Sequence, residues 1–313
     1  MAQPEPQTAR PLVPALLVAS GRSGSTMLMR LLASSPRVAT ETVFPFEHQY
    51  LRYFRLLSRT IEARAWDGAQ WDHLKFHMAS ADPAWTGGMI GPPPWRDARL
   101  LEPAEGEASF ADRALVAIWS EFSARVATRA ATGGAPVPTY WAEKCPDHPD
   151  RLDLPATLAP KCVFLVRDPR DQWLSAARMA LRSDGRGFHR LLGAADAAAL
   201  ERWLETESWR MPKVVESVER DRDRALLVRY EDVIADGEAE SRRIAEFLGV
   251  DLDPGALGVF DRDHATSRSP ERSVGRWRRE LDAVATETIE LALGRSMARL
   301  GYALGADAKR VDG

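Results

Sequence analysis

The most constraining feature of the sequence is a loop rich in glycine and serine that joins an apolar run to an amphipathic segment. The apolar run, Ala15 to Ser20, stops at Gly21 and is typical of a buried strand. From Thr26 the apolar residues recur at helical spacing as far as the turn-like Ser34-Ser35-Pro36. A strand, a loop and a helix in this order point backbone N–H groups and the positive end of the helix toward one place. The sequence therefore predicts an anion-binding loop over residues 21–26.

This loop is close to the Walker A pattern G-x-x-x-x-G-K-[ST] but departs from it. When the last glycine is aligned with Gly24, Ser25 stands where the lysine belongs and Ala19 stands where the first glycine belongs. A nucleoside triphosphatase would then lack the lysine that bridges the β- and γ-phosphates. Arg22 lies within the loop instead, which fits a transferred group less charged than a γ-phosphoryl group and needing no magnesium. The plainer alternative is a serine-rich helix cap without a ligand.

A second motif, KCVFLVRDPRDQWLSAARM over residues 161–179, again joins a strand to a helix. The apolar strand ends at Arg167, and Asp168-Pro169-Arg170 turns into a helix on which Ser175 lies. Arg167 and Ser175 can converge on one phosphate, the first from the strand end and the second from the helix. The alternative is an exposed Arg/Asp turn that caps the helix. We favour the phosphate site because the two motifs occur together in this order.

The two motifs resemble those of sulfotransferases. R-S-G-S-T resembles the loop P-R-S-G-T-T or P-K-S-G-T-T that binds the 5′-phosphosulfate, and V-R-D-P-R-D-x-x-x-S is similar to the 3′-phosphate site. The resemblance spans residue 15 to about residue 280, with residues 43–138 unaccounted for. It implies a P-loop kinase-like fold, 3′-phosphoadenosine 5′-phosphosulfate (PAPS) as donor and 3′-phosphoadenosine 5′-phosphate (PAP) as product. The motif layout is closest to the tyrosylprotein, or Golgi-type, branch.

The resemblance implies a set of nucleotide-binding residues. LVRYEDV, over residues 227–233, looks like the family's [VL]-x-Y-E-D-L strand end, and SVGRWRR, over residues 273–279, resembles the G-x-W-[KR] segment that closes over the nucleotide. In the second segment the glycine permits close approach, the tryptophan could pack on the adenine, and Arg276 or Arg278 could reach a phosphate. Alone, such a basic run is a solvated helix start. The expected nucleotide-binding residues are Arg22, Ser23, Gly24, Ser25, Thr26, Arg167, Ser175, Tyr230, Gly275, Arg276 and Trp277.

The resemblance also implies a cation and a base. Sulfuryl transfer needs a positioned acceptor, a group that takes its proton, and a cation at the leaving phosphate oxygen. WAEKCP resembles the family's [NE]-K-x-P segment, so Lys144 is the expected cation, with Arg22 on the sulfuryl oxygens. Glu41, after the first helix, matches the layout of the glutamate base of the tyrosylprotein branch, although about two residues earlier. Cytosolic sulfotransferases use a histidine where this chain has Pro146; the alternatives that stay open are Glu47, His48 and His148.

The rest of the chain predicts one α/β domain with a central parallel sheet flanked by helices. Three further strands or strand-like runs alternate with helical segments, which is typical of such sheets. The predicted strands are Thr139–Glu143, Lys161–Arg167 and Ala225–Tyr230, and the predicted helices are 46–64, 109–130, 171–181, 196–220, one that runs to Gly249 and one that ends near Tyr302. We expect a disordered tail over residues 1–10, a single domain over 11–303 and a second tail over 304–313.

An aromatic segment at about 43–138 is predicted to build the acceptor pocket and its lid. Its tryptophans are Trp66, Trp71, Trp85, Trp95 and Trp119. They favour a small, partly apolar or aromatic acceptor over a polyanionic glycan. The alternative is that most of them belong to the core.

Composition excludes several classes of protein. The net charge of −3 and the pI near 6.1 argue against a general nucleic-acid binder. Cys145 and Cys162 have no metal-ligand spacing, and we expect reduced thiols. The run Pro11–Ser20 resembles a signal-peptide core, but Arg10 is the only basic residue before it, and cleavage would cut into the loop motif. We expect a cytoplasmic protein without a membrane span, as a monomer or homodimer.

These observations predict a metal-independent, PAPS-dependent sulfotransferase that acts on a hydroxyl or amine. The main alternative is a magnesium-dependent kinase or nucleotide-phosphate transferase on the same fold. A second alternative is a protein that binds an adenosine bisphosphate without catalysis. A peptide tyrosine or a sugar also stays open as acceptor.

Overall fold

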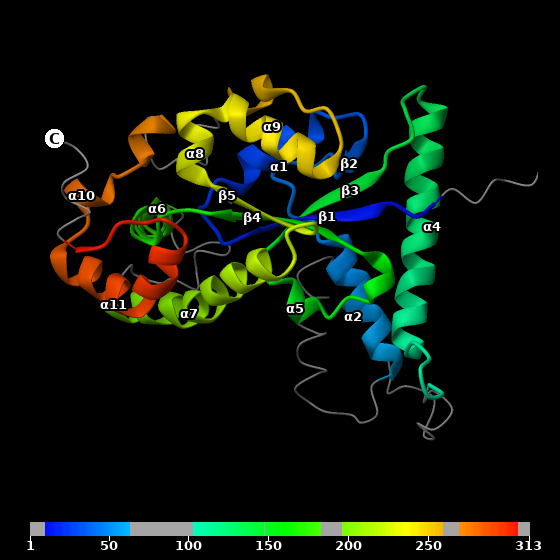
Figure 1. Ribbon diagram of the computed structural model, residues 1–313, viewed down its shortest axis with the longest axis horizontal. Coiled ribbons are helices and arrows are strands. Elements are labelled where there is room, and N and C mark those ends of the chain that lie inside the picture. The colour runs from blue at the N-terminus through cyan, green and yellow to red at the C-terminus, as the bar shows by residue number, and fades with distance from the viewer. Residues whose placement is uncertain (1–9, 63–102, 147, 183–195, 259–268, 306–313) are drawn as a thin grey trace, which may run out of the picture.

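The computed structural model describes residues 10–62, 103–146, 148–182, 196–258 and 269–305. In these residues the chain forms a sheet of five parallel strands in the order β2-β3-β1-β4-β5 (Figure 1). Because every neighbouring pair is parallel, the carboxyl ends of all five strands lie along one edge. The predicted fold class is therefore confirmed. The strands are β1 (Val13–Ala19), β2 (Val38–Thr40), β3 (Tyr140–Cys145), β4 (Lys161–Val166) and β5 (Ala225–Arg229).

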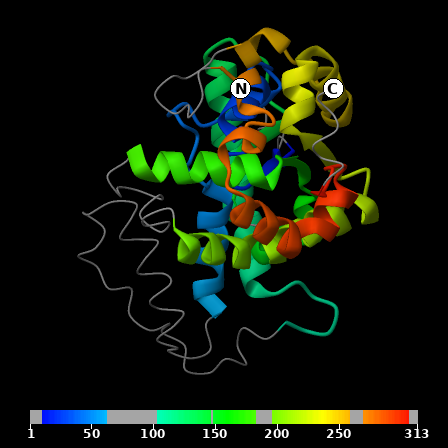
Figure 2. The same ribbon diagram turned by 90° about the vertical axis from the view of Figure 1, so that its left-hand side faces the viewer.

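The central strands are apolar on both faces because helices cover both faces of the sheet. Along β1, Leu16 and Val18 face one hydrophobic core, whereas Leu17 and Ala19 face the other. The helices over the first core are α2 (Tyr50–Glu62), α4 (Phe110–Thr132), α6 (Pro169–Arg182), α7 (Ala197–Arg220) and α11 (Ala283–Arg299). Those over the second are α1 (Ser25–Ala33), α8 (Tyr230–Ala235) and α9 (Gly237–Leu248). Figure 1 shows α1, α8 and α9 above the sheet and α2, α7 and α11 below it, and in Figure 2 the yellow helices α8 and α9 again lie above α7 and α11.

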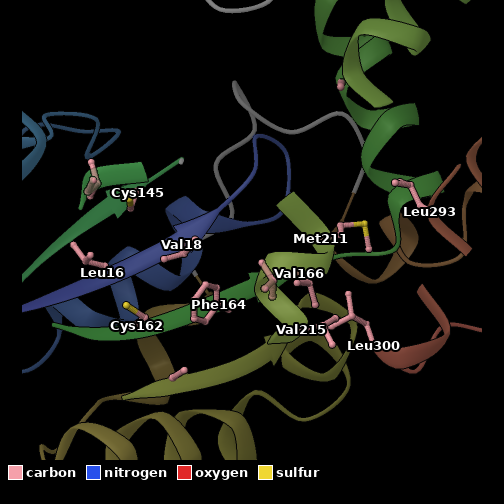
Figure 3. Close-up of a cluster of buried hydrophobic side chains, with 14 of the residues drawn as sticks. Leu16, Val18, Cys145, Cys162, Phe164, Val166, Met211, Val215, Leu293 and Leu300 are labelled. Atoms are coloured by element: carbon pink, nitrogen blue, oxygen red, sulfur yellow. The ribbon is translucent and has the colours of Figure 1, made fainter. Parts of the chain in front are cut away.

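The first core joins the sheet to α7 and α11. Figure 3 shows Val18 and Phe164 from the sheet beside Val215 of α7, with both cysteines in the same layer. Cys145 and Cys162 are buried free thiols, as expected, and burial raises the pKa of Cys162 to about 12. A thiol with such a pKa stays protonated at neutral pH and is inert. The cysteines therefore contribute packing to this core.

The structure differs from the predicted elements in a few places. The edge strand β2, Val38–Thr40, was not predicted, because three residues are too few for a periodic pattern. Helix α6 begins at Pro169, where proline fits the first helical position. Trp119 is fully buried and its indole donates to the carbonyl oxygen of Leu12 at 2.7 Å, so this tryptophan belongs to the core. The other four tryptophans of the aromatic segment lie outside the described residues, as do most residues of the two predicted tails.

Two short α-helices of four residues each also occur in the described residues. They are α5 (Pro149–Leu152), after β3, and α10 (Trp277–Glu280), which begins inside the basic run of residues 273–279, called the basic segment from here on. None of the helices in the described ranges is both long and apolar enough to cross a membrane.

Candidate functional site

The residues singled out in the sequence gather at the carboxyl edge of the sheet. Five of the predicted segments lie at or just after the end of a strand, whereas Ser175 lies within α6 and Gly275 to Trp277 follow no strand directly. The loop Gly21–Gly24 follows β1, Glu41 follows β2, Lys144 lies near the end of β3, Arg167 follows β4, and Tyr230 follows β5. Open parallel sheets bind their ligands at this edge. The topology thus brings five separate segments of the chain to one edge of the sheet.

The loop after β1 is held from behind by hydrogen bonds to its carbonyl groups. The side-chain amide of Gln172 donates to the carbonyl oxygen of Gly21 at 2.7 Å, and Arg167 Nη1 donates to that of Arg22 at 3.0 Å. The hydroxyl of Ser23, which is 1% exposed, donates to the carbonyl oxygen of Ser20 at 2.7 Å. Carbonyl groups held in this way leave the first N–H groups of α1 to face an anion.

Gly24 ends the loop in a conformation that suits glycine. It is the N-cap residue of α1, with φ at 95°. A Cβ at this position would lie 2.6 Å from Cδ2 of Tyr230, which is far below van der Waals contact. Both the backbone and the neighbouring ring therefore require glycine here.

The predicted 3′-phosphate residues lie against this loop. Arg22 Nε donates to the hydroxyl oxygen of Ser175 on α6 at 3.2 Å. Arg167 is 6% exposed and also donates through Nη2 to the carbonyl oxygen of Ser273 at 2.7 Å. Within the described residues, Nε of Arg167 is buried and has no hydrogen-bond partner. The two motifs are thus joined side by side, and a buried donor of Arg167 is left for a ligand.

Arg167, Arg178 and Arg276 form a cluster of guanidinium groups. Burial lowers the pKa of Arg276, and the nearby charges of Arg178 and Arg167 lower it further. Glu280 partly compensates, with an oxygen 2.5 Å from Arg178 Nη2 and 3.4 Å from Arg276 Nε. The carboxylates of Glu280 and Asp171 oppose the three arginines, which leaves a surplus of positive charge that favours an anionic ligand.

Tyr230 contacts both Arg167 of this cluster and Ser273 at the beginning of the basic segment. Its ring lies 4.5 Å from the guanidinium carbon of Arg167, within the range of a cation–π contact. Its hydroxyl lies 2.9 Å from the hydroxyl of Ser273. Tyr230 therefore fixes Arg167 and the beginning of the basic segment together.

The basic segment is anchored to α6 by Asp171. This carboxylate is 1% exposed and accepts the backbone N–H groups of Gly275 at 2.7 Å and Trp277 at 2.8 Å. Burial raises the pKa of Asp171 to about 6, while Arg167 and the two N–H groups oppose the shift. Trp277 is 4% exposed, and its ring lies 3.7 Å from the guanidinium carbon of Arg170. Gly275 and Arg276 therefore reach the site, whereas the indole of Trp277 covers Arg170.

Lys144 is a partly buried amine at the carboxyl edge of the sheet. Its Nζ donates to the hydroxyl oxygen of Thr26 at 2.9 Å and to the carbonyl oxygen of Pro45 at 2.6 Å. Burial lowers the pKa of Lys144 to about 8; Glu47 and Glu41 oppose the shift, and Arg22 and Arg30 add to it. These mutual effects show that the three expected catalytic residues share one electrostatic environment.

Glu41 is the buried carboxylate of this group. It is 7% exposed and accepts the backbone N–H of His48 with both oxygens, at 3.0 and 3.2 Å. The imidazole Nδ1 of His48 also contacts Glu41, and this side chain is 61% exposed. Glu47 is 71% exposed, with an oxygen 4.0 Å from Lys144 Nζ. Glu41 thus combines burial with a partner at the surface.

His148 lies apart from this group. It caps α5, where its Nδ1 accepts the backbone N–H of Asp150 at 3.2 Å, and its ring stacks on Phe164. It lines a cavity of about 380 Å³ together with Cys162 and Ala225, which stand at the amino ends of β4 and β5. Among the alternative bases, His148 therefore faces a different part of the molecule.

Sequence reasoning missed several residues of the site. Arg178 lies three residues after Ser175, one helical turn further along α6, and this spacing was the available signal. Gln172 and Asp171 lie inside the second motif, but their partners are over 100 residues away in the sequence. Glu143, beside Lys144, lies inside the lysine motif, but its partner Leu51 is 92 residues away in the sequence. In the described residues there is no group of three or more His, Cys, Asp or Glu side chains placed to hold a metal ion.

Comparison with known proteins agrees with this geometry. A model of the Sulfotransferase family matches residues 14–254, which is more than half of the chain. The chain therefore belongs to the sulfotransferase family and is a sulfotransferase. A search of curated proteins finds no match.

Similar solved structures are sulfotransferases of low sequence identity. The sulfotransferase domain of the Synechococcus PCC 7002 olefin synthase shares 19% identity over 97% of this chain and 100% of that chain, with a TM-score of 0.51. A sulfotransferase from Alicyclobacillus acidocaldarius shares 16% identity over 96% of this chain and all of that chain, with a TM-score of 0.46. A mouse sulfotransferase complexed with PAP shares 13% identity over 91% and 83% of the two chains, with a TM-score of 0.46. The first of these likenesses supports the fold.

Gly24→Ala tests whether the end of the loop requires glycine, and Gly134→Ala is its control. Gly24→Ala should lower the melting temperature and weaken PAP binding at least tenfold, because the new Cβ meets Tyr230. Gly134 has φ at 72° with no atom within 4 Å of its Cβ position. Gly134→Ala should therefore show only the strain of the left-handed conformation, about 1 kcal/mol, and unchanged PAP affinity. Thermal unfolding and calorimetry check both; equal behaviour of the two variants would contradict the role of Gly24.

Proposed function

We propose that this sulfotransferase moves the sulfuryl group of PAPS onto a hydroxyl or amine of a small, partly apolar or aromatic acceptor. The observation that carries the proposal is the junction of two anion sites. Arg22 of the loop donates to Ser175, and Arg167 donates back to the carbonyl oxygen of Arg22. A nucleotide with phosphates at both its 5′ and 3′ positions needs two anion sites that adjoin in this way.

The residues present fit such a donor. The loop from Arg22 to Thr26 and the beginning of α1 would hold the 5′-phosphosulfate through N–H groups and hydroxyls. Arg167, with its buried unpartnered Nε among the described residues, would hold the 3′-phosphate together with Ser175 and the nearby Arg178 and Arg276. PAPS supplies the activated sulfur; the protein supplies binding, orientation and charge.

The catalytic roles follow from the charges at the edge. Glu41 would take the proton of the acceptor, while the new bond forms between the acceptor atom and sulfur and the bond from sulfur to the 5′-phosphate oxygen breaks. Lys144 in its protonated form would stabilise the negative charge on that leaving oxygen, and Arg22 would stabilise the sulfuryl oxygens. These groups are fixed before the reaction, so little reorganisation is needed.

The side of α2 nearest this edge is aromatic. Tyr50 lies 6.2 Å from the ring of His48, and it stacks on Phe122 at 5.3 Å and meets Trp141 edge-on at 5.4 Å. Tyr50 and Phe122 are only partly buried. An aromatic wall next to Glu41 and His48 supports an acceptor with apolar or aromatic surface.

Arg167→Ala tests the 3′-phosphate site. The variant should weaken PAP by about 1.5–3 kcal/mol, the value of a charged hydrogen bond, and should weaken adenosine 5′-phosphate far less. Adenosine 5′-phosphate lacks the 3′-phosphate and serves as the control ligand. Calorimetry measures both affinities, and equal losses for the two nucleotides would remove Arg167 from this role.

The pKa of Lys144 predicts how activity depends on pH. The amine is charged below its pKa of about 8 and loses its charge as pH rises through that value. With labelled PAPS and a panel of phenols, alcohols and amines, kcat/KM should therefore fall above pH 8. Lys144→Ala should lower kcat more than PAP affinity.

Lys144→Arg provides the matched control for this pH dependence. The guanidinium stays charged, so the alkaline decrease should disappear even where the rate is lower. An unchanged alkaline decrease in Lys144→Arg would show that another group causes it. Wild-type protein that binds PAP but transfers no label to any acceptor would contradict the proposed function.

A further inference from the structure

Two consecutive residues near the end of β3 hold the same segment of chain from opposite faces of the sheet. Lys144 donates to the carbonyl oxygen of Pro45 at 2.6 Å, on the side of α1. Glu143 faces the other side and accepts the backbone N–H of Leu51 with both carboxylate oxygens, each at 3.2 Å. The segment between β2 and α2, residues 41–49, therefore passes around the end of β3 and is fastened on both sides.

Glu143 is buried, and its carboxylate oxygens accept hydrogen bonds from other parts of the protein. It is 4% exposed, and besides Leu51 it accepts the indole N–H of Trp141 at 3.0 Å. Burial raises its pKa to about 7, while these donors lower it and the charge of Glu41 raises it. The donors occupy both carboxylate oxygens, and they come from the protein itself. Glu143 is thus placed to hold other groups and is not placed as the base.

What Glu143 holds is the part of the chain that carries Glu41 and His48. In the register of β2 with β3, Thr40 pairs with Ala142; Glu41 directly follows β2, and Glu143 is the next residue of β3. Glu41 in turn accepts the N–H of His48, two residues before α2 begins. The beginning of α2 has its N–H groups directed at Glu143, which favours a carboxylate there.

We propose that Glu143 is a positioning residue for sulfuryl transfer: by holding the first turn of α2, it fixes Glu41 and His48 beside Lys144. The proposal rests on the proposed function for the roles of Glu41 and Lys144. The hydrogen bonds from the N–H of Leu51 to Glu143 are present in the protein without a ligand. No contact of Glu143 with a substrate is required.

Glu143→Gln is the direct test. The amide keeps one acceptor oxygen but places an NH₂ group among N–H donors, so the first turn of α2 loosens without a change in volume. We expect kcat to fall at least tenfold, because small misplacements of reacting groups have large effects on rate. The Kd for PAP should stay within twofold of the wild type, because Glu143 does not touch the loop after β1. Asp236→Asn is the matched control.

The control makes the same chemical change at another helix. Asp236 is exposed and caps α9 by accepting the N–H of Ala239 at 2.9 Å, away from Lys144. Its variant should keep kcat and PAP affinity within twofold. A merely structural role of Glu143 would lower stability and scale kcat and PAP binding together, whereas positioning separates them. Glu143→Gln with kcat within twofold of the wild type overturns the proposal.

Hydrogen exchange tests the contact between Glu143 and the first turn of α2 without the need for an acceptor substrate. In Glu143→Gln, backbone amides over residues 46–54 should exchange at least tenfold faster, while those of α1 keep the wild-type rate. Unchanged exchange over residues 46–54 overturns the proposal whatever the kinetics show. If the wild type transfers no label to any acceptor, the proposed function fails, and the exchange result alone decides whether Glu143 holds this segment.

Discussion

The guanidinium of Arg167 is the interaction on which the arrangement of the site depends. From the end of β4 it reaches the loop after β1 through Arg22, the basic segment through Ser273, and the ring of Tyr230 after β5. Three segments that are far apart in the sequence are thereby joined by one buried charge. A buried charge is costly unless it is paired, and here it lies close to Asp171, which lowers that cost. An anionic nucleotide would complete the compensation.

The site is also divided by charge along the edge of the sheet. At one end, Arg178 of α6 and Arg276 of the basic segment contact Glu280. At the other end, the carboxylates of Glu41 and Glu47 lie near the amine of Lys144. The first end suits a polyanion and the second suits proton transfer from a neutral acceptor. This separation of charge fits the proposed transfer of a sulfuryl group from a donor at the first end to an acceptor at the second.

Much of the fold could be predicted because its signals are local. Buried strands such as β1 and β4 are continuous apolar runs, and the alternation of strands with helices indicates parallel pairing. The loop from Arg22 to Thr26 and the pair Arg167 and Ser175 each lie within one short motif. Such residues are found in a sequence because strand, loop and ligand contact are neighbours in the chain.

The rest depends on contacts across long stretches of sequence. The edge strand β2 is too short to show a pattern, and its pairing with β3 spans some hundred residues. Glu143 reads as part of a lysine motif, and its hold on Leu51 is visible only in three dimensions. Trp277 has the expected place in the segment, but its indole packs on Arg170, a contact that no spacing rule predicts.

The central claim is that the two joined anion sites recognise a 3′-phosphorylated adenine nucleotide. Calorimetry with PAP, with ADP, and with ATP and magnesium tests this claim most directly. We predict that PAP binds most tightly and that a chelator leaves its affinity unchanged. Tighter binding of ATP with magnesium would contradict it, because the loop would then serve a nucleoside triphosphate.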